Sequence, residues 1–143
     1  EHLNVQFQRI DQAIAMAAMF MATNVSVQAI VALTESGSTA QWLSRVRSAV
    51  PIYALSPSRD SLRRMTLYRG VYPVCHDFHG TDVEQSLREG VQLLLHKGYI
   101  KTGDRIIMTM GEHTRNEGGT NSLRLVQVGA DGHMEYNPSL DVH

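Results

Sequence analysis

The chain has 143 residues, of which 43% are hydrophobic and 19% are charged, values typical of one globular domain with a sizeable core. Thirteen basic and fourteen acidic residues give a formal net charge of -1, which argues against nucleic acid or an anionic membrane surface as a partner. The single Cys75 has no partner for an internal disulfide, and no apolar segment reaches the roughly 20 residues that span a bilayer. We therefore expect a cytoplasmic location.

The first predicted element is a helix over residues 9–24. Its apolar residues recur at helical spacing: Ile10, Ile14, Ala17, Ala18 and Met21. We expect this helix to be mostly buried, with its methionines filling core space rather than binding a ligand. The segment before it lacks the order of a signal peptide and has no initiating Met, so we expect a piece of a longer protein.

Three rounds of strand and helix follow. The predicted strands cover residues 28–34, 51–56 and 70–75, and the predicted helices cover residues 38–47, 58–68 and 81–98. Short, continuous apolar strands are typical of a parallel sheet that is covered on both faces. The alternation therefore predicts helices on both sides of a parallel sheet.

Two more strands are predicted at residues 105–110 and 122–129, and the loop between them has no helical pattern, so they should pair antiparallel. The fold class is α/β, a three-layer αβα arrangement with a five-stranded mixed sheet whose last strand is antiparallel. Residues 1–129 form one domain. Residues 130–143 have no periodicity and are expected to be irregular or frayed.

A cluster of small residues, "TESGST", separates the first strand from its helix. It contains Thr34, Ser36, Gly37, Ser38 and Thr39. Backbone N–H groups at a helix start attract anions, and small residues let an anion approach them, so the cluster suits a phosphate group. Ser36 or Ser38 capping the helix is the alternative. A catalytic Ser36 is a third, although a nucleophile elbow needs glycine where Thr34 stands.

Two other segments are candidates for parts of a site. His76 and His79 in "HDFH" have a metal-compatible separation but no second ligand pair, so no metal is assigned. The loop 111–121 is long and contains glycine, which is typical of functional loops. If the last strand pair flanks the first strand, its residues can close on a bound phosphate ester: Arg115, Gly118, Gly119 and Thr120.

Five segments, in order, resemble the C-terminal domain of pyruvate kinase, particularly its bacterial forms: "ALTESGSTA", "PIYALS", "LYRGVYPV", "KGYIKTGDRIIMTMG" and "GGTNSLRLVQV". The resemblance runs from about Asp11 to Val128. It implies a role in glycolysis, where phosphate passes from phosphoenolpyruvate to ADP. It also implies Mg²⁺ or Mn²⁺ and K⁺ as cofactors of the full enzyme, bound in a separate (β/α)₈ barrel that is this domain's partner. Without that barrel, this chain should be inactive and should need no cofactor.

The resemblance also implies an effector site. Thr34, Ser36, Gly37 and Thr39 match phosphate-contacting positions of the family, and residues 118–121 match its effector loop. This resemblance favours phosphate binding over capping alone.

Forms activated by fructose 1,6-bisphosphate hold the second phosphate with a Trp and an Arg near the fourth helix. Here residues 76–90 contain no Trp, Arg88 is displaced, and Glu35 stands where eukaryotic members often have Lys. The expected effector is a sugar monophosphate, such as glucose 6-phosphate or ribose 5-phosphate, or a nucleoside monophosphate.

The last predicted strand, Ser122 to Val128, reads as an edge strand with apolar residues at Leu123, Leu125 and Val128. Family C-terminal domains meet at this region across a two-fold axis, so the resemblance implies a homo-oligomer. Two alternatives to a regulatory domain remain open: an oligomerisation module with a degenerate effector site, and an unrelated small α/β enzyme that uses Ser36.

Overall fold

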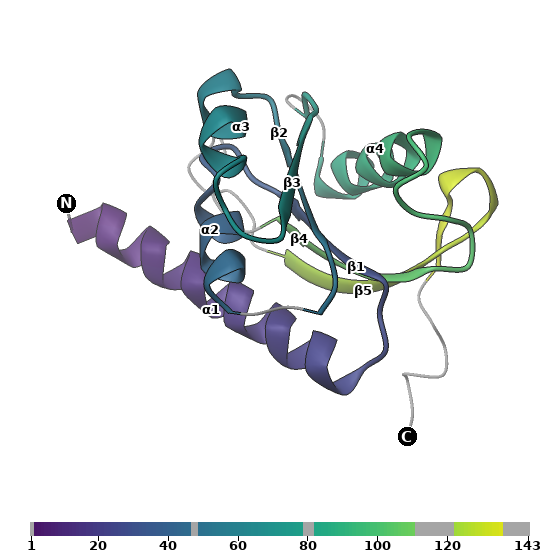
Figure 1. Cartoon of the computed structure of the whole chain (residues 1–143), viewed down its shortest axis with the longest axis horizontal. Coiled ribbons are helices and arrows are strands. Elements are labelled where there is room, and N and C mark those ends of the chain that lie inside the picture. The colour runs from purple at the N-terminus through teal and green to yellow at the C-terminus, as the bar shows by residue number, and fades with distance from the viewer. Residues whose placement is uncertain (1, 47–48, 79–81, 111–121, 136–143) are drawn as a thin grey trace.

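The structure is a computed structural model that describes residues 2–46, 49–78, 82–110 and 122–135 (Figure 1). Its elements are α1 (His2–Asn24), β1 (Ala29–Leu33), α2 (Ser38–Arg45), β2 (Ile52–Ser56), α3 (Arg59–Met65), β3 (Val71–Cys75), α4 (Val83–His96), β4 (Arg105–Met110), β5 (Ser122–Val128), the 3₁₀ helix η1 (Ala130–Gly132) and β6 (Met134–Glu135). The predicted alternation of strands and helices is present. Helix α1 begins seven residues before its predicted start, and the other ends lie within three residues of their predicted positions.

One mixed sheet runs through the domain in the order β3-β2-β1-β4-β5-β6. β3, β2, β1 and β4 are parallel, and β5 is antiparallel to β4, as the sequence predicts. The predicted number of five strands is wrong, because β6 adds a sixth strand antiparallel to the end of β5. β6 has only two residues, which is too short for an alternating pattern to show in the sequence.

Helices cover both faces of the sheet, so the domain has three layers and two cores (Figure 1). β1 is buried along its whole length. Val31 and Leu33 pack in the core beneath α4, whereas Ile30 and Ala32 pack in the core beneath α1, α2 and α3. This burial on both faces explains why β1 is a continuous apolar run rather than an alternating one.

Helix α1 is less buried than its composition predicts. Its buried stripe consists of Asp11, Ala15, Ala18 and Met19. Ile10, which was expected in the core, is 38% exposed, and Phe20 is 71% exposed. Ala and Met occur on every side of this helix, so spacing alone does not distinguish its core side from its outer side.

The two edges of the sheet differ. At the β3 edge, the Ile52 N–H donates to the Gly70 carbonyl and the His76 N–H donates to the Ser56 carbonyl. Alternation along a parallel ladder then turns the nitrogen of Pro73 outward, where a proline removes a donor that another strand would need. At the other edge, β6 pairs with Gln127 and Val128, and on the side of β5 away from β4 the rest of that strand has no strand beside it within the described residues.

The side chains of β5 divide between the two cores. Leu123 and Leu125 pack half-buried against the core beneath α1 and α2, whereas Val126 and Val128 are buried beneath α4. The apolar residues predicted as one alternating set therefore serve two opposite faces. Arg124, also on β5, crosses to α4 and forms an ion pair with Glu84.

Candidate phosphate-binding site

The turn after β1 lies where the order of the strands reverses. β2 and β3 extend the sheet on one side of β1, and β4 joins β1 on its other side. In a sheet of this kind, a crevice opens outside the carboxyl ends of the strands at that point, and ligands commonly bind there. Residues 34–37 leave β1 at this point of the sheet and lead directly into α2.

The hydroxyl groups of the turn hold its backbone in shape. The Thr34 N–H donates to the Leu55 carbonyl at 2.9 Å, and the Gly37 N–H donates to Thr34 Oγ1 at 3.0 Å. The Ser38 N–H donates to Ser36 Oγ at 3.1 Å. These contacts fix the turn against β2 and satisfy the N–H groups of Gly37 and Ser38.

The start of α2 keeps the character of an anion site. Gly37 occupies the N-cap position and has no side chain to cap the helix, so a conventional cap by Ser36 or Ser38 is not what forms here. The first intrahelical bond runs from Gln41 N–H to the Gly37 carbonyl, which leaves Thr39 and Ala40 without an intrahelical acceptor. No acidic residue lies in this first turn to offset its partial positive charge.

Gly37 is required by the turn itself. Its φ of 89° lies in the left-handed region, which other residues rarely adopt. A Cβ at this position would also come within 3.2 Å of Met65 Cγ and 3.3 Å of Met65 Sδ on α3. The glycine therefore permits both the sharp entry into α2 and the close approach of α3.

Thr39 carries an unusual hydroxyl group. Its side chain is fully buried at the second position of α2, and its Oγ1 has no hydrogen-bond partner in the described part of the chain. A buried hydroxyl without a partner destabilises the folded state by about 1–3 kcal/mol. The position is therefore one where a hydrogen-bonding ligand would restore a missing contact.

Side chains from β2 and α3 hold the outer carbonyl groups of the turn. The Glu35 carbonyl accepts from Ser61 Oγ at 2.6 Å and from Ser56 Oγ at 3.1 Å. The next carbonyl, that of Ser36, accepts from Arg64 Nη2 at 2.8 Å. Ser56, Ser61 and Arg64 thus form a clamp on the backbone of the turn.

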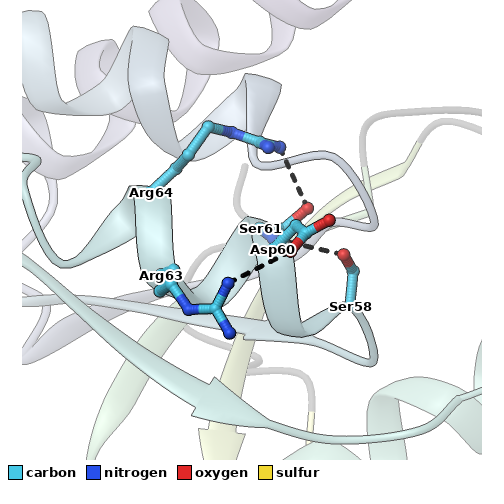
Figure 2. A network of polar contacts seen from close by, with 5 residues as sticks. All are labelled: Ser58, Asp60, Ser61, Arg63 and Arg64. Atoms are coloured by element: carbon cyan, nitrogen blue, oxygen red, sulfur yellow. Dashed lines mark hydrogen bonds and ion pairs between the residues drawn. The ribbon is translucent and has the colours of Figure 1, made fainter.

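The clamp depends on the start of α3, which Figure 2 shows from close by. Ser58 caps this helix by accepting from the Ser61 N–H at 3.2 Å. Arg64 Nη2 also donates to Ser61 Oγ at 3.2 Å, while the neighbouring Arg63 turns to Asp60 at 3.3 Å. The sequence predicts the helix, but no local pattern marks Ser61 or Arg64 as part of the site.

The second half of the predicted site lies outside the described residues. This applies to Gly118, Gly119 and Thr120, and also to Arg115. The ends of their segment can be placed, because Leu33 pairs with Met110 and Met110 pairs with Ser122. The connection between β4 and β5 therefore starts and finishes at the carboxyl end of the parallel strands, where the turn of residues 34–39 also lies.

His76 lies directly after β3, at the carboxyl end of the parallel strands. Burial lowers the pKa of its imidazole, and the charges of Glu89 and Asp77 partly oppose that effect. Its Nε2 is buried without a hydrogen-bond partner in the described residues, and its ring lies 6.0 Å from that of Phe78. His79 lies outside the described residues, so the pair is not brought together here.

Metal-binding clusters and membrane-spanning helices are both absent from the described residues. No group of three or more His, Cys, Asp or Glu side chains is arranged there to hold a metal ion. None of the helices in that part of the chain combines the length and the apolar character needed to cross a bilayer.

The fold is that of an α/β domain with a mixed sheet, and comparison with known proteins gives its family. Residues 12–126 match the family described as "Pyruvate kinase, alpha/beta domain". The chain is 42% identical over 127 residues to pyruvate kinase II of Salmonella typhimurium, and 40% identical over 127 residues to a pyruvate kinase of Buchnera aphidicola subsp. Schizaphis graminum. The chain thus belongs to the pyruvate kinase alpha/beta domain family.

The structural comparison agrees with this assignment. A Cryptosporidium parvum pyruvate kinase, solved in complex with ADP, superposes with a TM-score of 0.70 at 26% identity. That match covers 82% of this chain and 23% of the other. In the two bacterial relatives, the match covers 88% of this chain but only 26% of the relative. The chain therefore spans about a quarter of the length of the pyruvate kinases it resembles.

Proposed function

We propose that this chain is the C-terminal regulatory domain of a pyruvate kinase and that the turn of residues 34–39 binds the phosphate of an effector. The effector class is a sugar monophosphate or a nucleoside monophosphate. The parent enzyme would transfer phosphate from phosphoenolpyruvate to ADP in its barrel domain. The Mg²⁺ or Mn²⁺ and K⁺ of that reaction would belong to the barrel domain of the parent enzyme.

The observation that carries the effector proposal is the buried hydroxyl of Thr39. Valine has nearly the same shape and no hydroxyl, so it would fill this position without leaving a polar atom unpaired. A hydrogen bond from Oγ1 to a ligand would account for a threonine at this position. The adjacent helix start, with its N–H groups and no acidic side chain in the first turn of α2, suits a phosphate oxygen as the hydrogen-bond partner.

The test replaces Thr39 with valine and measures both stability and binding. In Thr39→Val, we expect the free energy of unfolding to stay unchanged or rise, because an unpaired buried hydroxyl is removed. We also expect calorimetry to show about tenfold weaker binding of glucose 6-phosphate or ribose 5-phosphate, which corresponds to about 1.4 kcal/mol. A loss of binding without a loss of stability separates a ligand contact from a helix cap.

Thr109→Val is the matched control. Thr109 is also fully buried, and its Oγ1 also lacks a partner in the described residues, but it lies on β4 rather than in the turn. This variant should bind the sugar phosphates as the wild type does. Equal affinities in Thr39→Val and the wild type would place the effector elsewhere. Gly37→Asp is a poorer test, because the left-handed φ and Met65 make that variant strained in the absence of any ligand.

An oligomerisation module with a degenerate effector site is the second candidate, and the open edge of β5 favours it. If no sugar phosphate or nucleoside monophosphate binds the wild type at millimolar concentration, this candidate replaces the first. Since the family is established, we set aside the alternative of an unrelated enzyme that uses Ser36.

A further inference from the structure

We propose that Arg64 is a specificity-determining residue of the phosphate site, and that its guanidinium selects ligands whose ester group carries two negative charges. The inference rests on the proposed effector function. It assigns the charge that holds the phosphate to α3, although the turn that receives the phosphate lies between β1 and α2.

The turn itself carries an unfavourable charge for a dianion. Its second residue is the half-buried Glu35, and none of residues 34–39 is basic. Backbone N–H groups and hydroxyls bind one anionic charge well, but a second charge next to a carboxylate requires a compensating cation. The cation must therefore come from another element.

Arg64 is placed to supply that cation. Its Nη2 donates a hydrogen bond to the Ser36 carbonyl of the turn at 2.8 Å. Both of its observed bonds, to Ser36 and to Ser61 Oγ, use Nη2. A guanidinium has five N–H donors, so the donors on Nε and Nη1 are not used in these contacts.

Arg64 and Arg63 are adjacent residues that differ in their electrostatic partners. Arg63 forms an ion pair with Asp60 at 3.3 Å, whereas Arg64 has no ion pair within the described part of the chain. Arg64 is also exposed, so a ligand can reach it. A second, independent feature marks the same place, because the buried Thr39 hydroxyl at the start of α2 also lacks a partner there.

Two sugar esters of the same shape test the charge directly. Glucose 6-phosphate is a dianion at pH 8, because its second pKa is about 6, whereas glucose 6-sulfate carries a single charge at that pH. The ratio of their affinities, measured by calorimetry at pH 8, reports how strongly the site prefers the second charge. A residue that only positions the turn would change both affinities by the same factor and leave the ratio unaltered.

The variants are Arg64→Gln and Arg63→Gln, which change the net charge equally on the same helix. In Arg64→Gln, we expect the affinity for glucose 6-phosphate to fall about tenfold and that for glucose 6-sulfate to fall no more than about threefold. Arg64→Lys, which keeps the charge, should recover most of the preference for the phosphate. Arg63→Gln should leave the ratio as it is in the wild type.

The outcomes separate this inference from the proposed function. If the wild type binds glucose 6-phosphate and Arg64→Gln keeps the wild-type ratio, Arg64 does not select the charge, and the effector function still stands. If the wild type binds neither ester, the effector site itself is refuted, and the assignment of Arg64 fails with it. Circular dichroism of each variant checks that α3 remains folded.

Discussion

The peptide planes of the turn after β1 are set by side chains from other elements. In a trans peptide, the carbonyl and the following N–H point in opposite directions. The Glu35 carbonyl is held toward Ser56 and Ser61, so the Ser36 N–H must point away from them. The clamp therefore orients a donor of the turn without contacting it.

Single residues of the site differ in how well the sequence predicts them. Gly37 and Thr39 stand out because glycine and hydroxylated residues between a strand and a helix have a local physical meaning. Ser61 and Arg64 have no such signal, since they meet the turn across a separation of 26 to 28 residues. Only the close approach of α3 to α2, which Gly37 permits, brings them to the site.

His76 should make the stability of the domain depend on pH. Its pKa is lowered in the folded state from an ordinary value of 6.5, so the unfolded chain takes up the proton first as the pH falls. The free energy of unfolding should therefore decrease as the pH drops through 6.5 toward the folded pKa. Urea titrations between about pH 5 and pH 8 measure this slope.

His76→Gln should flatten that slope, because the group that takes up the proton is gone. His96→Gln, at an exposed position near the end of α4, provides the control for losing one histidine. If the slopes of His76→Gln and the wild type coincide, burial of His76 does not contribute to the pH dependence.

At the scale of elements, periodicity predicts position better than it predicts which side faces the core. β1 and α4 lie where their patterns place them, because an apolar run and an amphipathic helix each have a clear period. α1 and β5 have apolar residues on more than one side. For these two elements, packing against the neighbouring layers decides which side is buried. The apolar pattern of the element alone does not identify that side.

The open edge of β5 leads to a prediction about association. We expect two copies to approach each other along Ser122–Val128 across a two-fold axis, because β6 covers only the end of this edge among the described strands and the edge carries half-buried leucines. Sedimentation velocity over a range of protein concentrations should show a reversible dimer. Leu123→Lys should weaken it, because a charge is added next to the edge.

Leu67→Lys is the control for non-specific apolar association. Leu67 is 84% exposed beyond the end of α3, away from β5, so its replacement should leave the dimer intact. A wild-type chain that stays monomeric at the highest concentrations would rule out pairing at this edge.

At the scale of the whole molecule, the chain corresponds to about a quarter of its relatives, and its expected role is regulatory. We predict that the purified chain forms no pyruvate from phosphoenolpyruvate and ADP, even with Mg²⁺ and K⁺ present. A coupled assay with lactate dehydrogenase detects pyruvate sensitively. Turnover by the wild type that disappears in Ser36→Ala would contradict this prediction and would reinstate a catalytic serine.

Pro73 limits the forms that such an assembly can take. A protein whose sheet has two open edges can add copies indefinitely and grow into a fibre, because each added copy presents a new open edge. Here Pro73 removes a donor at the β3 edge, so among the described strands the β5 edge is the one open to pairing with a strand of another copy. When two copies pair through the same β5 edge, both edges are occupied, and the assembly stops at a dimer. Pro73, at the opposite edge of the sheet from β5, thus favours a closed assembly over a polymer.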